Sequence, residues 1–315
     1  MNMIISILGL LLGLVVLFYS SDLAVSKMIS IAQMFGLSMF TIGFVVSSIG
    51  TDLPEIFNSI TSAYLGHGAI SIGDSFGSVL TQITLVLGLI PFFCTFCRLI
   101  PSNFFIVGIT EVIIVAFSVW LSLDGSVTRF DGILLILVWI ISIFVIRRFG
   151  DEKIVAEEGV LLSEPTEKMS KLVGYIILGF AGIGVGSYLV IDSVITRSRA
   201  FGLSEYIVSF FILSLGTSMP ELVVAISAIR KKHFELAVGD IVGSCIVDAT
   251  LGIGLGPVFF PINFDSSALL FTGIYAIVAS FIVVSILSRR GVNDRTTGGI
   301  FILVYLISWL IPLLL

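Results

Sequence analysis

The feature that most constrains this chain is a series of apolar runs, each about 20 residues long, repeated along the whole sequence. A helix needs about 20 mostly apolar residues to cross the hydrocarbon core of a bilayer. Runs of this length favour helices over a porin-type barrel, whose strands are short and alternate. The runs predict an all-α membrane protein with ten transmembrane helices, at 3–20, 36–63, 69–93, 103–123, 130–148, 171–191, 203–229, 234–260, 267–288 and 297–314.

The composition excludes two broad classes of protein. Of the 315 residues, 57% are hydrophobic and 12% are charged, whereas a soluble domain is about 45–50% apolar and about 25% charged. This excludes a water-soluble globular protein and a disordered chain. A net charge of −5 with only 16 Lys and Arg argues against nucleic acid as a partner. We therefore expect membrane lipids around the chain and a function within or across the bilayer.

The distribution of basic residues predicts the orientation in the membrane. Cytoplasmic loops carry an excess of Lys and Arg. If the N-terminus lies outside, the inner loops hold thirteen basic residues and the outer loops hold three, namely Arg129, Arg197 and Arg199. We expect a multi-pass protein of the cell (plasma) membrane with both termini outside.

One long polar stretch divides the chain into two halves. It lies at 150–170 and is expected to be a cytoplasmic linker between five helices in 1–149 and five in 171–315. Because five is an odd number, the second set must enter the membrane with the opposite orientation. The sequence therefore predicts two inverted five-helix repeats.

The two halves share sequence motifs at a constant offset of 166 residues. Gly50-Thr-Asp-Leu-Pro-Glu55 recurs as Gly216-Thr-Ser-Met-Pro-Glu221, and the Gly-Asp-x-x-Gly-Ser motif starting at Gly73 recurs at Gly239. Aligning 47–88 with 213–254 gives 14 identities in 42 positions. Inverted repeats with interrupted helices near the midplane are the architecture of secondary transporters.

The first motif predicts interrupted helices in spans two and seven. A proline inside a span removes a backbone donor and clashes with the preceding turn, so we expect unwinding at Thr51–Leu53 and Thr217–Met219. Irregular backbone at membrane depth survives where it lines a polar cavity. Its carbonyls and hydroxyls are hard oxygen donors, which suit sodium, calcium or magnesium.

The motif acids predict that the balancing charge is a mobile cation. Glu55 and Glu221 lie inside apolar runs, where a carboxylate costs on the order of 2.5–3.5 kcal/mol. Lys and Arg occur only at the ends of the four motif helices. The simplest counter-charge is therefore a transported ion.

The second motif places further polar groups on helix faces. Asp74, Ser78 and Gln82 are spaced i, i+4, i+8, and Asp240, Ser244 and Asp248 repeat the pattern. We expect Asp74 and Asp240 to solvate the mouths of their helices rather than to be inner ligands.

These duplicated motifs resemble those of the calcium/cation antiporter superfamily, and most of all its prokaryotic sodium/calcium exchangers. The resemblance implies transported calcium and sodium, no cofactor, no enzymatic activity, and a site between helices two, three, seven and eight. It also implies that helices one and six slide past the rest, aided by the glycines of span six. The implied metal ligands are Thr51, Asp52, Glu55, Ser78, Gln82, Thr217, Ser218, Glu221, Ser244 and Asp248.

Departures from the family pattern leave alternatives open. Asp52 stands where Ser is usual and Gln82 where Asn is usual, so the cage holds an extra carboxylate. Proton-coupled or potassium-dependent transport, and divalent ions other than calcium, stay open. An intramembrane aspartyl protease is a remote alternative, because the first Gly of Gly-x-Gly-Asp is missing before Asp74. The sequence does not determine the oligomeric state, and a monomer is plausible.

Overall fold

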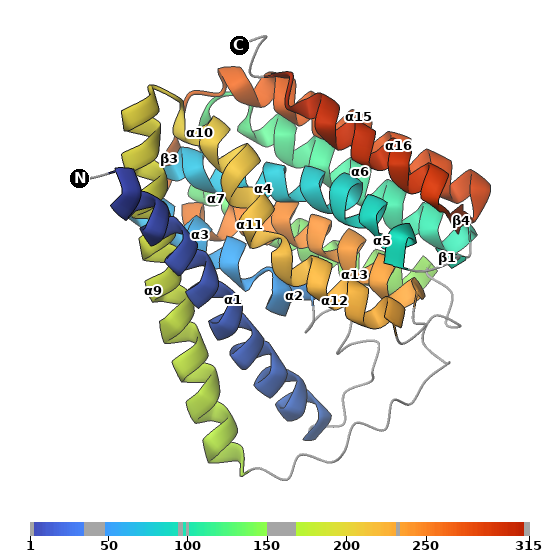
Figure 1. Ribbon diagram of the computed structural model, residues 1–315, viewed down its shortest axis with the longest axis horizontal. Coiled ribbons are helices and arrows are strands. Elements are labelled where there is room, and N and C mark those ends of the chain that lie inside the picture. Colours follow the sequence, from blue (N-terminus) through green and yellow to red (C-terminus); the bar gives the residue numbers. More distant parts are fainter. Residues whose placement is uncertain are drawn as a thin grey trace.

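The computed structural model describes residues 3–34, 48–93, 97–98, 101–149, 168–230 and 234–311, and almost all of them are helical (Figure 1). The helices of the first half are α1 (Met3–Met34), α2 (Ser48–Thr51), α3 (Leu53–Tyr64), α4 (Gly68–Leu80), α5 (Leu87–Phe93), α6 (Pro101–Ser122) and α7 (Arg129–Phe149). A π-helical segment, η2 (Thr81–Val86), joins α4 to α5, and two-residue strands β1 (Cys97–Arg98) and β2 (Ser126–Val127) flank α6.

Among the described residues, the second half has a similar order of elements, with α10 and η3 in addition before its interrupted helix. Its helices are α9 (Met169–Phe201), α10 (Glu205–Val208), α11 (Ser214–Thr217), α12 (Met219–Arg230), α13 (Phe234–Val247), α14 (Ile253–Phe259), α15 (Ser267–Arg290) and α16 (Arg295–Ser308). Two π-helical segments, η3 (Ser209–Leu213) and η4 (Asp248–Gly252), and two short strands, β3 (Ile262–Asn263) and β4 (Val292–Asn293), complete it.

Eight helical segments within the described residues are long and apolar enough to cross a membrane, which makes this a multi-pass membrane protein. They correspond to eight of the ten predicted spans. The first part of the predicted span 36–63 and most of the predicted linker 150–170 lie outside the described residues. The predicted last span is represented by α16, a shorter apolar helix.

Short antiparallel ladders tie the loops of one half to those of the other. Cys97 pairs with Asn293 at one ladder, and Ser126 pairs with Asn263 at the other. The loop between α5 and α6 thus meets the loop between α15 and α16, while the α6–α7 loop meets the α14–α15 loop. Both contacts connect segments that are far apart in the sequence.

Glycine allows close backbone contact between helices of different halves. A Cβ on Gly88 of α5 would lie 2.9 Å from the carbonyl oxygen of Gly298 in α16. A Cβ on Gly254 of α14 would lie 3.0 Å from the carbonyl oxygen of Gly132 in α7. Real Cβ atoms are rarely that near a carbonyl oxygen. The helices can therefore approach this closely only because these four positions are glycines.

Helices α1 and α9 form a long antiparallel pair at one side of the bundle (Figure 1). Side chains at Gly13, Gly179 and Gly186 would collide with the facing helix, because a Cβ at each position would lie within 3.0 Å of its atoms. The resemblance implied that the glycines of span six ease sliding past the rest of the protein. Gly179 and Gly186 bring α9 into close contact with α1. Sliding of these two helices past the rest stays a prediction.

A cap fixes the loop before α16. Asp294 accepts hydrogen bonds from the backbone N–H and the hydroxyl of Thr297, at 2.9 and 2.8 Å. These bonds, with Arg290 at 2.8 Å, hold the pKa of the Asp294 carboxyl below its usual value. Gly291, with φ +62°, ends α15 in the left-handed conformation.

Candidate functional site

Each half contains a helix that is interrupted at a single residue before a proline. Asp52 separates α2 from α3 with φ −84° and ψ 7°, and Ser218 separates α11 from α12 with φ −79° and ψ 6°. The backbone nitrogen of Asp52 still bonds to the Ser48 oxygen at 3.1 Å, and that of Ser218 to the Ser214 oxygen at 3.0 Å. The predicted interruptions are therefore confirmed in position, but each is a local kink rather than an unwound stretch.

The kink in the first half releases a carbonyl that α1 then binds. Pro54 has no N–H to donate to the carbonyl of Gly50, four residues earlier. The Ser21 hydroxyl of α1 donates to the Gly50 oxygen at 2.9 Å. A neighbouring helix thus satisfies the backbone group that the proline leaves free.

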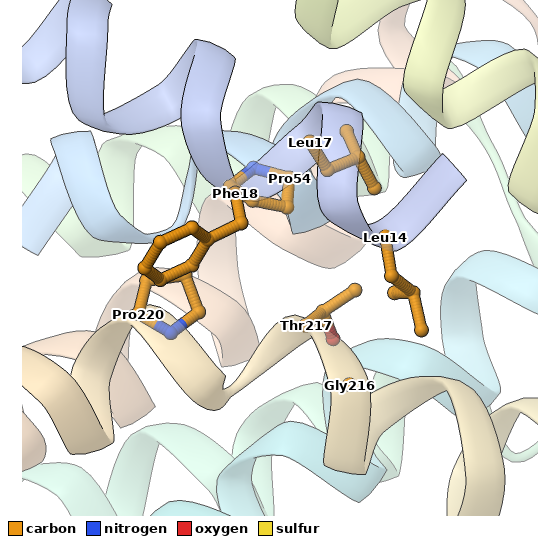
Figure 2. Close-up of a pocket in the computed structure, with 7 residues that line it drawn as sticks. All are labelled: Leu14, Leu17, Phe18, Pro54, Gly216, Thr217 and Pro220. Carbon is orange, nitrogen blue, oxygen red and sulfur yellow. The ribbon is translucent and has the colours of Figure 1, made fainter. Parts of the chain in front are cut away.

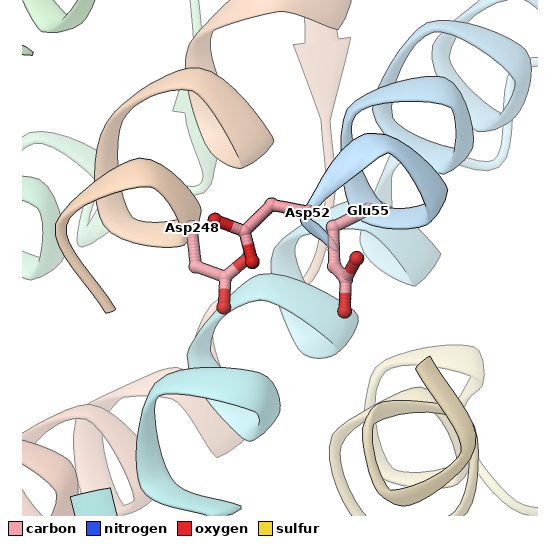
Figure 3. A group of neighbouring side chains, drawn as sticks. All are labelled: Asp52, Glu55 and Asp248. Atoms are coloured by element: carbon pink, nitrogen blue, oxygen red, sulfur yellow. The ribbon is translucent and has the colours of Figure 1, made fainter. Parts of the chain in front are cut away.

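Three carboxyl groups converge between the two halves. Asp52 and Glu55 come from the first interrupted helix and Asp248 from the start of η4, and one oxygen of each lies within 4.8 Å of the others (Figure 3). Glu221 from the second interrupted helix is within electrostatic range of all three. All four are at most 1% exposed. The two halves therefore contribute carboxyl groups to a single buried cluster.

Hydroxyl and amide groups line this carboxylate cluster (Asp52, Glu55, Glu221 and Asp248). Ser78 donates to the Glu55 carboxylate at 3.4 Å and lies 3.4 Å from the Thr217 hydroxyl. On the other side, Gln82 donates to Asp248 at 3.0 Å. The hydroxyls of Thr51 and Ser244 are 3.4 Å apart and join the halves a second time.

Several cluster oxygens have no hydrogen-bond partner within the described residues. They are both carboxyl oxygens of Asp52 and of Glu221, one oxygen each of Glu55 and Asp248, and the Ser218 hydroxyl. None of the Lys and Arg residues whose side-chain burial the structure describes is buried. Buried charges are normally paired or coordinate metals. An arrangement of hard oxygen donors without a protein counter-charge is suited to binding cations.

All ten predicted ligands are buried, at 4% exposure or less. Nine of them are connected by the contacts above. Ser218 is the exception, since its hydroxyl bonds to no other described residue.

Sequence reasoning missed the π-helical segments that carry Gln82 and Asp248. A π-helical turn is a frequent feature of functional sites, but the sequence contains no pattern from which we could identify one.

The expectation that Asp74 solvates a helix mouth is wrong. Asp74 is 1% exposed and accepts hydrogen bonds from Asn58 at 2.9 Å and from Thr217 at 3.0 Å. Asp240, its counterpart, is also buried. Close helix contact explains the burial of Asp74, because Gly73 and Gly77 on α4 face the carbonyls of the helix that leads to Thr217.

A small hollow lies between α1 and the interrupted helices (Figure 2). It has a volume of about 10 Å³ and is lined by Leu14, Leu17, Phe18, Pro54, Gly216, Thr217 and Pro220. Thr217 belongs both to this lining and to the surroundings of the carboxylate cluster. The hollow therefore adjoins the cluster on the side of the second interrupted helix.

Comparison with known proteins identifies the family. The model of the family described as sodium/calcium exchanger protein matches residues 5–147 and 171–314. The chain therefore belongs to the sodium/calcium exchanger family. Its relatives of named activity are transporters rather than enzymes.

Individual relatives are similar over nearly the whole chain. A putative antiporter, CaxA, of Alkalimonas amylolytica is 30% identical over 84% of both chains. The sodium/calcium exchanger MaX1 of Methanosarcina acetivorans is 24% identical over 98% of both. A structure of the sodium-calcium exchanger NCX_Mj soaked with Na⁺ and Sr²⁺ has a TM-score of 0.66 and 27% identity, covering 98% of each chain.

Proposed function

We propose that the protein is a secondary antiporter that exchanges calcium for sodium across the cell membrane. The observation that carries this proposal is the carboxylate cluster, which is buried, contributed by both halves and without a buried Lys or Arg among the residues whose side-chain burial the structure describes. The family and the exchanger relatives support cation antiport. Calcium and sodium are the proposed cargo, and the ten predicted ligands are the proposed site.

The experiment is calcium uptake into proteoliposomes loaded with sodium. An outward sodium gradient is expected to drive ⁴⁵Ca²⁺ uptake, and dissipating the gradient is expected to stop it. Separate arms replace the sodium gradient with a pH jump or with potassium, and add magnesium as a competitor. Uptake driven by the pH jump alone, with no response to sodium, would replace sodium by proton as the coupling ion.

Symmetry-related contacts support two repeats, 1–149 and 171–315. Adding 166 to the residue numbers of β2 gives β4, and β1 maps within one residue of β3. The repeat therefore relates the β1–β4 ladder to the β2–β3 ladder. The glycine contacts are related in the same way, because Gly88 maps to Gly254 and Gly132 to Gly298. We further propose ten spans in two inverted five-helix sets, with the linker 150–170 inside and both termini outside, on the basis of the excess of Lys and Arg in the predicted inner loops.

The differences between the halves support transport by alternating access. Ser21 of α1 bonds to the Gly50 carbonyl, whereas its repeat counterpart, Ser187 of α9, is fully buried with no hydrogen-bond partner in the described part of the chain. The hollow lies beside Gly216, the counterpart of Gly50. We infer that the α1–α9 pair is docked on the first half here, and that in the opposite state Ser187 binds the Gly216 carbonyl.

Replacing Ser21 with Ala is expected to depopulate the state seen here, because the Gly50 carbonyl loses its donor. An unsatisfied buried group costs about 1–3 kcal/mol, which is roughly a 5- to 150-fold change in the equilibrium. Spin labels at Ser26→Cys and Arg230→Cys in a cysteine-free background would report the two states as two distances. Ser187→Ala is the matched control and is expected to favour the present state. Identical distance distributions in both variants would contradict the inference.

A further inference from the structure

Asp74 lies beside the carboxylate cluster but is enclosed by hydrogen bonds. The Asn58 amide donates to its Oδ2 at 2.9 Å, and the Thr217 hydroxyl donates to its Oδ1 at 3.0 Å. Asp74 is 1% exposed. Each of its carboxyl oxygens thus has a protein donor, in contrast to the oxygens of Asp52 and Glu221.

The bond to Asp74 determines where the Thr217 hydroxyl points. A hydroxyl has one proton and two lone pairs. Besides Asp74, the acceptors near this hydroxyl are the backbone oxygens of Leu213 at 3.3 Å and Ser214 at 3.4 Å, the Ser78 hydroxyl at 3.4 Å and the Glu55 carboxylate. At 3.0 Å the bond to Asp74 is shorter than the contacts with the two backbone oxygens and with Ser78, and it ends on a carboxyl group, so it is the strongest. Donation to Asp74 leaves the lone pairs of Thr217 Oγ1 free to act as a ligand beside Ser78, which lies at 3.4 Å.

We propose that Asp74 is a positioning residue, which holds the Thr217 proton away from the carboxylate cluster so that Thr217 Oγ1 binds the transported sodium ion. Asn58 fixes the Asp74 carboxyl in place. The proposal rests on the proposed function, because it requires sodium to bind at the cluster.

The Asn58 amide has no counterpart at the equivalent position of the second half. The repeat counterpart of Asp74 is Asp240, but Val224 stands where a counterpart of Asn58 would lie. A valine offers no amide to hold a carboxyl group. The repeat therefore duplicates the acid and the threonine, whereas the position equivalent to Asn58 holds a side chain without an amide.

Sodium affinity is the sensitive measurement. A neutral oxygen ligand contributes a larger share of the binding of a monovalent ion, because the attraction to carboxylates grows with ion charge. Asp74→Ala leaves Thr217 to donate to a backbone oxygen or to the Glu55 carboxylate instead, so its proton is no longer held away from the carboxylate cluster. We expect the half-saturating sodium concentration in the uptake assay to rise about tenfold, that for calcium to rise less than threefold, and the maximal rate to change less than twofold.

A double-mutant cycle separates positioning from a structural role. Thr217→Val is expected to raise the half-saturating sodium concentration as much as Asp74→Ala does, and the combined variant no further. The proposal would be overturned if the half-saturating sodium concentration of the combined variant rose by the product of the two single-variant effects. It would also be overturned if Asp74→Ala left the sodium dependence unchanged. Thr217→Ser keeps the hydroxyl and is expected to stay within threefold of the wild type.

Asp74→Asn keeps the test decisive if Asp74→Ala does not fold. The new amide oxygen at position 74 still accepts from Thr217, provided that the Asn58 side-chain amide rotates so that its oxygen faces the new amide nitrogen. We therefore expect the half-saturating sodium concentration to change less than threefold. A tenfold change would assign the effect to the charge and overturn positioning. Failure of the proposed function itself would look different, because the wild type would then show no sodium-driven uptake.

Discussion

Replacing Glu221 with Gln is expected to lower sodium-driven calcium uptake by about 100-fold or more. Both oxygens of Glu221 lack a hydrogen-bond partner in the described part of the chain, so a bound cation is the partner that we assign to them. Removing one member of a buried charge pair costs about 3–5 kcal/mol, and about 1.4 kcal/mol corresponds to a factor of ten. The amide keeps the shape of the side chain and removes its charge. ⁴⁵Ca²⁺ uptake into sodium-loaded proteoliposomes measures the loss.

Glu111→Gln is the matched control for this change. Glu111 lies in α6, is fully buried and accepts a hydrogen bond from Ser280 at 2.8 Å, which a glutamine oxygen also accepts. The carboxylate cluster takes its members from the two interrupted helices and η4, whereas Glu111 lies in α6. We expect uptake within about twofold of the wild type. Equal activity of Glu221→Gln and the wild type would remove the assigned role from Glu221.

Adding one methyl group at Gly77 is expected to destabilise the protein. Alanine is favoured over glycine within a helix by about 1 kcal/mol, so propensity alone predicts a gain. At Gly77, however, the new Cβ would collide with the Phe210 carbonyl and lie 2.7 Å from the Ser214 hydroxyl oxygen. Overpacking of this kind costs about 1–3 kcal/mol, which outweighs the gain. A fall in the melting temperature of the purified protein in detergent is the expected result.

Gly184 of α9 provides the comparison for Gly77. It lies within a helix, and a Cβ there would meet no atom of the described residues within 4 Å. Gly184→Ala is therefore expected to keep or raise the melting temperature. Equal stability of the two variants would show that α4 and η3 can separate slightly at little cost.

Much of this site could be predicted from the sequence because its residues are duplicated. A proline two residues after a kink and an acid directly after the proline are local patterns, and the offset of 166 residues made Glu55 and Glu221 a pair. Their meeting at one place requires that the two halves pack against each other. The structure shows this through the contact of Ser78 with Thr217.

Other features depend on tertiary contacts, which periodicity does not encode. The partnership of Asn58 with Asp74 joins two helices, and neither neighbouring sequence nor the repeat indicates it, since Val224 replaces the amide in the second half. The contact of Gly186 with α1 likewise depends on which face of α9 is turned inward. The spacing of Asp74 and Gln82 assumed a regular α-helix, whereas Gln82 lies within the π-helical segment η2.

Competition between sodium and calcium for the purified protein tests the central claim most directly. Equilibrium binding of ⁴⁵Ca²⁺ is measured as sodium is raised, for the wild type and for a variant carrying both Glu55→Gln and Glu221→Gln. If acids of both halves form one cation site, sodium displaces calcium completely from the wild type, and the variant binds no calcium. Calcium binding that is indifferent to sodium, or that survives both substitutions, would contradict the claim.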